Sequence, residues 1–252
     1  MDPQLLIKTG ERLDDLQLSG LNIFQNPEKF CFGMDAVLLS GFVQKLITPG
    51  KKNIKVLDMC TGTGIIPLLL SAKTDASHIT GIEIQPDSAD MASRSVQMND
   101  LEERIDIVCG DIREAASIFE AASFDIVTCN PPYMIADHGA QSPGTELAIA
   151  RHEVCCTLAD VCMAAEKMLK PGGSFYMVHR PFRLAEIIRT LSDHHLEPKT
   201  MRLVHPYIDK EPNMVLIQAT RGGKPRMNVE RPLIVYSAPG IYSEEMSRDY
   251  GY

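Results

Sequence analysis

The amino-acid sequence predicts an α/β fold, in which a seven-stranded, mostly parallel sheet with one antiparallel strand carries helices on both faces. Two observations lead to this prediction. From residue 54 onward, short apolar segments typical of strands alternate with segments whose apolar residues recur at the helical period. Near the end, the candidate strands at 200–205 and 213–219 are joined by too few residues for a parallel crossover. They must form a hairpin, so one strand is reversed.

The composition is that of an ordinary globular protein, with 252 residues of which 44% are hydrophobic and 23% charged. The longest apolar run, at 65–70, contains Pro67 and is far shorter than the ~18 residues of a membrane span. No signal peptide is expected, because the first residues lack a basic segment followed by an apolar one. The seven cysteines lie in apolar stretches without the paired spacing of a zinc site. We therefore expect a cytoplasmic protein with reduced cysteines and no metal.

The elements are expected in the following order. Apolar alternation around Ser19-Gly20 predicts a hairpin over 12–25, and helical spacing predicts a helix over 34–46. Pro86 is typical of a helix start, and the Pro-Gly-Gly at 171–173 of a helix end. Further helices are expected over 151–169 and 184–191, and strands over 54–59, 78–84, 104–109, 124–129 and 174–179.

These elements divide the chain into three parts. We expect a hairpin or cap segment over 1–33, a main domain over 34–220 and a C-terminal extension over 221–252. The connection over 134–150 is too long for an ordinary loop between a strand and a helix, which makes it a candidate lid or substrate loop.

Two motifs at neighbouring strand ends indicate a nucleoside site. Asp58 opens a loop in which Gly62 and Gly64 let a ligand approach the backbone before a helix start. Glu83 ends the next strand, 25 residues after Asp58, where a carboxylate can accept both hydroxyls of a ribose. A plain tight turn and a helix N-terminal charge are the alternatives. In Asp111-Ile112, after the third strand, the carboxylate could accept a bond from an adenine amine or could simply cap a helix.

The fourth strand ends in Asn130-Pro131-Pro132-Tyr133, which suits the methylation of an amine. An exocyclic amine of adenine is a poor nucleophile because its lone pair is delocalised. The Asn130 oxygen and the Pro131 carbonyl can accept its two hydrogens, while the prolines fix the turn. Tyr133 offers a face on which a flipped-out base can stack. Such catalysis rests on positioning and needs no metal.

Together these motifs resemble those of the Rossmann-like class I methyltransferases that use S-adenosylmethionine and methylate amino groups. Phe30-Cys-Phe-Gly-Met-Asp35, the opening Glu11-Arg-Leu-Asp-Asp and the ending Pro232-Leu-Ile-Val-Tyr236 are similar to segments of the bacterial tRNA(Val) adenine-N6 methyltransferase family. The resemblance implies methyl transfer from S-adenosylmethionine to N6 of an adenine beside the anticodon, with S-adenosylhomocysteine as the product. The residues expected around the donor are Phe32, Gly33, Met34, Asp35, Asp58, Cys60, Thr61, Gly62, Gly64, Glu83, Ile84, Asp111, Ile112 and Asn130.

Three other functions stay open at this point. A glutamine-N5 methyltransferase that acts on a release factor has a similar Asn-Pro-Pro-Tyr motif, but this chain lacks an evident N-terminal helical domain of that family. A DNA adenine methyltransferase would normally need extra sequence for base readout. A non-catalytic nucleoside-binding or scaffold domain would make the motif at Asn130 accidental. The oligomeric state is not predicted.

The net charge of −8 is unusual for a protein that binds nucleic acid. A tRNA would therefore have to be held by a local basic patch. Arg221, Lys224, Arg226 and Arg231 follow the final strand, and we expect them to gather near the mouth of the site and contact phosphates, unless they form only a solvated loop.

Overall fold

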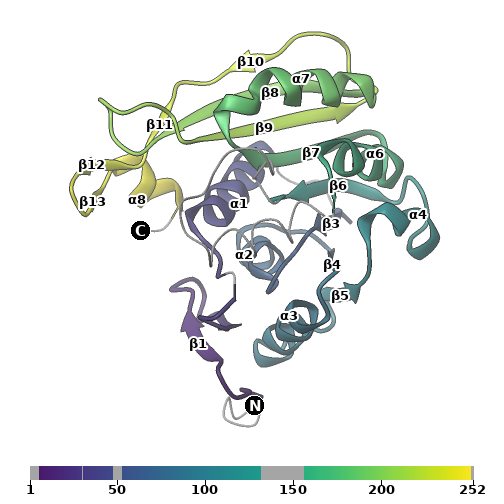
Figure 1. Ribbon diagram of the computed structural model, residues 1–252, viewed down its shortest axis with the longest axis vertical. Helices are drawn as coiled ribbons and strands as arrows, with labels where there is room; N and C mark the ends of the chain where they lie inside the picture. The colour runs from purple at the N-terminus through teal and green to yellow at the C-terminus, as the bar shows by residue number, and fades with distance from the viewer. Residues whose placement is uncertain (1–5, 30, 48–52, 132–155, 251–252) are drawn as a thin grey trace.

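The computed structural model describes residues 6–29, 31–47, 53–131 and 156–250, and a twisted sheet of nine strands lies at its centre (Figure 1). The seven predicted strands are present in the order β8-β9-β7-β6-β3-β4-β5, and two short strands that the sequence did not predict, β10 and β11, pair with β8. Their bounds are β3 Lys55–Met59, β4 His78–Glu83, β5 Ile105–Cys109, β6 Phe124–Cys129, β7 Leu169–His179, β8 Leu196–His205, β9 Met214–Arg221, β10 Asn228–Val229 and β11 Leu233–Ile234.

The predicted reversed strand is β9. It lies between β7 and β8 and pairs antiparallel with both, whereas β3, β4, β5, β6 and β7 are parallel neighbours. Because β8 and β9 are joined by a short turn, the chain reverses there and the hairpin is confirmed. We call the end of the sheet where β3 to β7 and β8 finish its carboxyl end; β9 begins there and finishes at the opposite, amino end.

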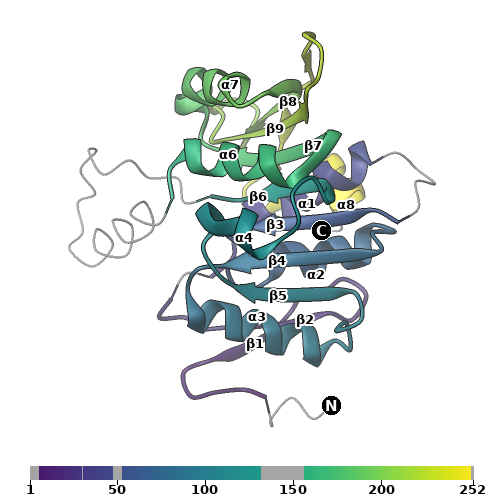
Figure 2. The ribbon, with the colours of Figure 1, turned by 90° about the vertical axis from the view of Figure 1, so that its right-hand side faces the viewer.

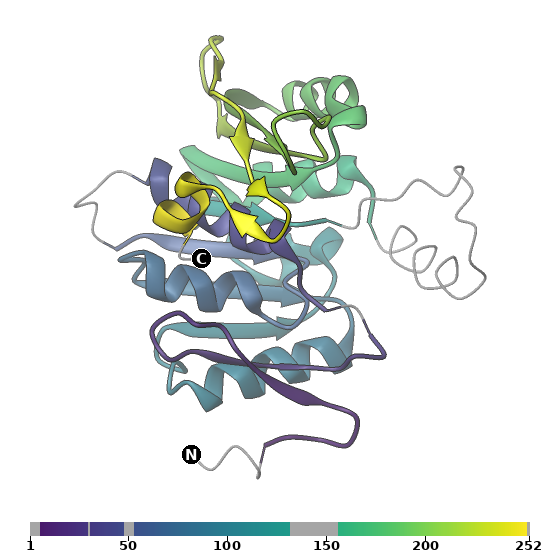
Figure 3. The same cartoon turned by 90° about the vertical axis from the view of Figure 1, so that its left-hand side faces the viewer.

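Helices cover both faces, as the alternation of strands and helices predicts. Helices α1 to α3 and α8 lie on one face (Figure 3), and α4, α6 and α7 lie on the other (Figure 2). Neighbouring strand residues alternate between the two cores: Val56 and Ile126 pack on the first face, Leu57 and Val127 on the second. The helices are α1 Met34–Leu46, α2 Ile65–Lys73, α3 Pro86–Met98, α4 Ala115–Ile118, α6 Leu158–Met168, α7 Leu184–Asp193 and α8 Glu244–Tyr250.

The helix expected over 151–169 is shorter in the structure. Residues 151–155 lie outside the described residues, and α6 begins only at Leu158. The Thr157 side chain accepts a hydrogen bond from Asp160 N, and the Asp160 side chain accepts one from Thr157 N, so these residues form a capping box that the sequence analysis did not use. Strand β7 then starts directly at Leu169, earlier than the predicted 174. The Pro-Gly-Gly segment lies inside it as an irregularity in the pairing with β6, where Phe124 pairs with Leu169 and Ile126 with Ser174.

The predicted N-terminal hairpin is confirmed as β1 Arg12–Asp15 and β2 Asn22–Gln25. It packs on α3, where Phe24 N donates to Ser95 Oγ at 3.0 Å. The Arg94 guanidinium lies 5.2 Å from the centre of the Phe24 ring and forms an ion pair with Glu11 at 2.6 Å. The hairpin is therefore fixed to the helix that follows Glu83.

The C-terminal segment packs on the same core as the main domain. Leu233, Val235 and Met246 are buried in the cluster that contains α1 and α2, and a second small hairpin, β12 Tyr236–Ala238 with β13 Ile241–Tyr242, precedes α8. Across the described part of the chain, no helix combines the length and the apolar character that a membrane crossing requires.

Candidate functional site

The glycine loop between β3 and α2 has an unusual backbone. Cys60, Gly62 and Gly64 all have positive φ angles, of 58°, 57° and 86°. A Cβ at Gly62 would meet no atom within 4 Å, so this turn of the loop presents open backbone, as expected for a ligand that approaches closely. At Gly64 a Cβ would lie 3.0 Å from Ala92 Cβ, so here glycine allows α2 and α3 to pack.

The Asp58 side chain stabilises the glycine loop through hydrogen bonds. The side chain is fully buried and accepts hydrogen bonds from the hydroxyls of Thr61, at 2.6 Å, and Thr128, at 2.5 Å. Burial raises the pKa of this carboxyl to about 7, although the two hydroxyls lower it. The sequence predicted Asp58 as one of the residues around the donor. The structure adds a role in supporting the loop, and nothing in the sequence indicated Thr128, which takes part in it.

The Glu83 carboxylate connects the end of β4 to the glycine loop through hydrogen bonds. One carboxylate oxygen accepts Gly62 N–H and the other accepts Gln85 N–H, both at 2.9 Å. Gly81, which the sequence analysis also missed, makes this close approach possible because a Cβ there would lie 2.9 Å from Thr61 Oγ1. The spacing that predicted a shared site therefore corresponds to direct contact in the structure. Ile84, which follows, is 36% exposed beside it.

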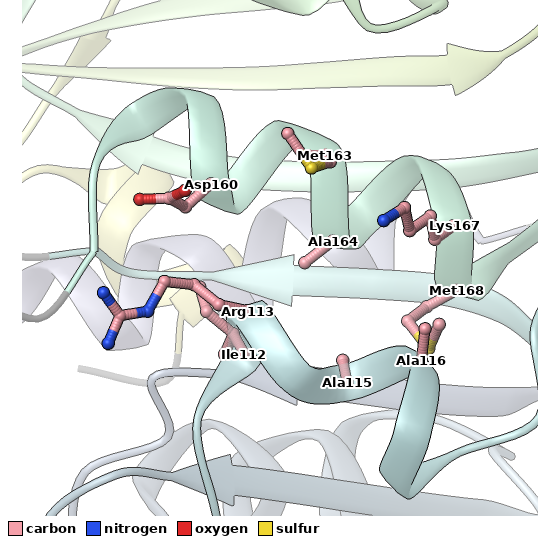
Figure 4. A pocket seen from close by; sticks show the side chains of 9 residues that line it. All are labelled: Ile112, Arg113, Ala115, Ala116, Asp160, Met163, Ala164, Lys167 and Met168. Carbon is pink, nitrogen blue, oxygen red and sulfur yellow. The ribbon is translucent and has the colours of Figure 1, made fainter.

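Of the two roles considered for Asp111, a helix cap and a bond to adenine, the structure shows the helix cap. Its carboxylate caps the short 3-10 helix Ile112–Glu114 by accepting Arg113 N–H at 2.9 Å, so the helix-cap alternative is present. Hydrogen bonds from the Arg113 side chain lower the pKa of Asp111. Ile112 is buried and lines a shallow pocket against α6 with neighbours that include Met163 and Lys167 (Figure 4). A bond to adenine stays a prediction.

Asn130 and Pro131 follow β6 at the carboxyl end of the sheet. In β6, Cys129 pairs with Met59 of β3 on one side and with Met177 of β7 on the other. Asn130 therefore emerges directly beside the start of the glycine loop, and it is half-buried while Pro131 is buried. Pro132, Tyr133 and the candidate lid over 134–150 lie outside the described residues.

The segment before α1 is tied to the hairpin. Gln25 is buried, and its Oε1 accepts Phe32 N–H at 3.3 Å, which was not expected from the sequence. Gly33 is the N-cap of α1, and the Asp35 carboxylate accepts Ala36 N–H at 2.9 Å in the first turn. Met34 begins the helix. These residues thus have a fixed backbone, while their contact with a donor stays a prediction.

The cysteines near the site are reduced. The six that the structure describes are free thiols, and Cys60 Sγ lies 3.9 Å from Cys156 Sγ. A hydrogen bond with Cys129 and burial raise the pKa of the Cys60 thiol, so it stays protonated in the loop.

The expectation that the basic set gathers near the mouth of the site is wrong for its first members. Because β9 is antiparallel, its final residue, Arg221, pairs with Leu196 at the start of β8. Lys224 and Arg226 follow between β9 and β10, and β10 begins at Asn228 beside Thr200 of β8, so they lie toward the amino end of the sheet, opposite Asn130. Arg221 Nη1 also donates to the Leu169 carbonyl, and Nη2 pairs with Glu166 at 3.0 Å, so this guanidinium stabilises the fold. Arg231 lies exposed between β10 and β11.

Comparison with known proteins gives consistent similarities. The Methyltransferase small domain family matches residues 35–197. The tRNA1(Val) (adenine(37)-N6)-methyltransferase of Aeromonas hydrophila is 27% identical over 213 residues, which are 84% of this chain and 85% of that protein. The protein of the same name from Porphyromonas gingivalis is 28% identical over 220 residues, covering 86% and 85%.

Solved structures share the fold at low identity. A predicted O-methyltransferase of Agrobacterium tumefaciens has a TM-score of 0.68 at 20% identity, covering 86% of this chain and 95% of that one. The geranyl diphosphate C-methyltransferase of Streptomyces coelicolor, in complex with S-adenosyl-L-homocysteine, has a TM-score of 0.54 at 13% identity, covering 73% and 77%. The arrangement of sheet and helices is thus that of the Rossmann-like class I methyltransferases, as predicted.

Proposed function

The chain belongs to the Methyltransferase small domain family, and from this premise we propose that it methylates N6 of an adenine in tRNA with S-adenosylmethionine as the donor. The observation that carries the proposal is the meeting of Asn130-Pro131, the glycine loop and Glu83 at one end of the sheet. The named relatives act on adenine 37 of tRNA1(Val), and we infer the same class of substrate here. A tRNA substrate in turn favours a cytoplasmic location.

The residues around the glycine loop fit the donor. When bound, S-adenosylmethionine supplies a methyl group activated by its sulfonium. A carboxylate has about four acceptor positions, and Glu83 uses two of them for Gly62 and Gln85, so it can accept the ribose hydroxyls with the others. The open backbone at Gly62 and the start of α2 fit the amino-acid part of the donor. Ile84 can pack on the adenine, with Asp111 near its amine.

The acceptor would enter from the side of β6. The Asn130 amide oxygen and the Pro131 carbonyl would accept the two hydrogens of the N6 amine, which turns its lone pair toward the donor. Two consecutive prolines restrict the backbone at Pro131, so little entropy is lost when its carbonyl binds the amine. We keep Pro132 and Tyr133 as proposed members of the site, the latter as the stacking partner of the base.

Methyl transfer to separate substrate pools tests the proposal. Purified protein, labelled S-adenosylmethionine and unmodified tRNA(Val) transcript should give N6-methyladenosine on nucleoside mass spectrometry, and a transcript with guanosine at position 37 should give none. Release factor and double-stranded DNA with adenines serve as parallel acceptors. Label in the release factor with none in RNA would replace the proposal by the glutamine methyltransferase alternative, and label only in DNA would replace it by the DNA alternative.

A further inference from the structure

Gln25, the last residue of β2, carries a buried polar atom without a partner. Its side chain is 0% exposed, and its Nε2 has no hydrogen-bond partner in the described part of the chain. The orientation of the amide is fixed, because Phe32 N–H is a donor and must face the oxygen, which it contacts at 3.3 Å. The two N–H donors of Nε2 therefore lie on the other side of the amide. A buried donor that no acceptor satisfies costs free energy, so it indicates a place where a ligand can bind.

Hydrogen bonds fix the position of Gln25 along α3. Asn22 N–H donates to Asn99 Oδ1 at 2.9 Å, and Phe24 N–H donates to Ser95 Oγ at 3.0 Å. Strand β2 therefore runs antiparallel to α3, and two residues of the strand correspond to about one turn of the helix. Gln25, the next residue, lies about half a turn nearer to the start of α3 than Ser95.

The glycine loop meets α3 at nearly the same level. A Cβ on Gly64 would lie 3.0 Å from Ala92 Cβ, and Ala92 is about one turn nearer to the start of α3 than Ser95. Side chains alternate along a strand, so Gln25 projects on the same side as Ile23. Ile23 is buried in the core cluster that contains the first two residues of α2. The Gln25 amide is therefore directed toward the start of α2, where the glycine loop ends.

The chain after Gln25 also contacts this end of the sheet. Lys29 Nζ forms an ion pair with Asp87, in the first turn of α3, at 2.5 Å. Asp87 follows Glu83 by four residues. Phe32 then returns to Gln25 through its N–H, just before α1 begins. Gln25 thus lies among the starts of α1, α2 and α3, at the carboxyl end of the sheet where the donor is expected.

We propose that Gln25 binds the carboxylate in the amino-acid part of S-adenosylmethionine, an inference that rests on the proposed function. The open backbone at Gly62 and the N–H groups at the start of α2 fit this part of the donor, and Gln25 adds a side-chain donor that is directed toward it. An N–H donor suits the carboxylate and not the ammonium group. A neutral amide also suits a buried position, because a buried cation would have to be desolvated in the free protein.

Calorimetric titration of Gln25→Met with two ligands tests the inference. S-adenosylhomocysteine contains the amino-acid part, whereas 5′-methylthioadenosine has the same adenine, ribose and sulfur without it. Methionine is about as long as glutamine but has no N–H donor. The affinity for S-adenosylhomocysteine should therefore fall about 10- to 150-fold, the usual cost of a lost hydrogen bond to a charged group. The affinity for 5′-methylthioadenosine should stay within about twofold of wild type.

Gln97→Met is the matched control, because it makes the same change in a half-buried glutamine near the end of α3, away from the glycine loop. It should bind both ligands as wild type does. Thermal melting shows whether each variant is folded. If Gln25→Met does not fold, Gln25→Asn keeps the amide but withdraws it by one methylene, and the same selective loss of affinity is expected.

The outcomes separate this inference from the proposed function. An equal loss of affinity for both ligands would show that Gln25 only supports the fold of the site, and an unchanged affinity for S-adenosylhomocysteine would show that it does not contact the donor. Either result would overturn the inference. A wild-type protein that binds S-adenosylhomocysteine but transfers no methyl group to tRNA would contradict the proposed acceptor instead, while the selective loss in Gln25→Met would still establish the contact with the donor.

Discussion

The two halves of the site are built differently. In the donor half, at the ends of β3 and β4, polar groups bond to one another: Asp58 to Thr61 and Thr128, and Glu83 to Gly62. In the acceptor half, Asn130 follows β6 and is half-buried, while Phe182 follows β7 and is exposed. A small donor can be enclosed by a preformed loop, whereas a nucleic acid needs an open surface. We therefore expect substitutions in the donor half to change the affinity for the donor, and substitutions in the acceptor half to change methyl transfer to tRNA.

The largest effect is expected in the acceptor half. Asn130→Ala removes the side-chain acceptor for the N6 amine and should lower kcat for methyl transfer about 10²- to 10³-fold, the usual cost of one group that acts on the reacting centre. Single-turnover assays with saturating tRNA and donor measure this rate. Asn228→Ala, on the outer strand β10, is the control and should turn over as wild type. Near wild-type turnover of Asn130→Ala would make the motif structural.

In the donor half, Glu83→Ala should weaken the binding of S-adenosylhomocysteine about 100-fold. Two bonds from ribose hydroxyls to a charged acceptor are lost, and at ~1.5 kcal/mol for each bond the loss is ~3 kcal/mol, which is about 100-fold in affinity. Gly62 loses its partner as well. Calorimetric titration gives the dissociation constant, and thermal melting confirms that the variant is folded. Glu103→Ala, an exposed carboxylate away from the loop, should bind as wild type. An unchanged affinity in Glu83→Ala would contradict its assignment to the ribose.

Asp58 should make the donor half sensitive to pH. Its pKa is raised by burial from 3.8 to about 7, so the folded protein holds this proton over a range in which the unfolded chain has lost it. The contribution to stability is therefore complete below about pH 4 and is lost as the pH rises through about 7. Relative to Asp58→Asn, the wild-type free energy of unfolding should fall on the order of 2 kcal/mol between pH 5 and 7. Urea denaturation across this range measures the difference, and parallel profiles would contradict it.

The smallest effect is expected at the amino end of the sheet. Lys224→Ala/Arg226→Ala should leave KM for tRNA within about twofold of wild type, because these residues follow the end of the reversed strand β9, opposite Asn130. Steady-state methylation of tRNA measures KM for this variant and for wild type. A rise well above twofold would show that the amino end of the sheet contacts the tRNA.

The donor half was easier to predict from the sequence because its determinants are local. The glycine loop, Glu83 and Asp111 each follow a strand, and parallel strands bring such residues to one end of a sheet. The residues that support them were missed, since Gly81 and Thr128 act through packing and hydrogen bonds from neighbouring strands. No local pattern marks such a neighbour before the strand order is known.

The acceptor half was harder to predict from the sequence than the donor half. The sequence identified β9 as a reversed strand, yet the residues after it were expected near the site. Their position follows from the direction of the strand, which carries Arg221 to the level of Leu196 and away from Asn130. The exposure of Phe182 and Ile208 was not predicted, because an apolar residue beside Pro181 or in a turn is interpreted as part of a core until the fold is known. Domain boundaries at 33 and 220 stay proposals.

The donor affinity of Asn130→Ala tests most directly whether the donor half and the acceptor half bind their substrates with separate residues. Calorimetric titration of S-adenosylhomocysteine into this variant and into wild type compares the two dissociation constants under one condition. The account predicts values within about threefold of each other, although methyl transfer is almost lost. A weakening as large as that of Glu83→Ala would show that Asn130 belongs to the donor half, and the separation of donor and acceptor groups at this end of the sheet would be wrong.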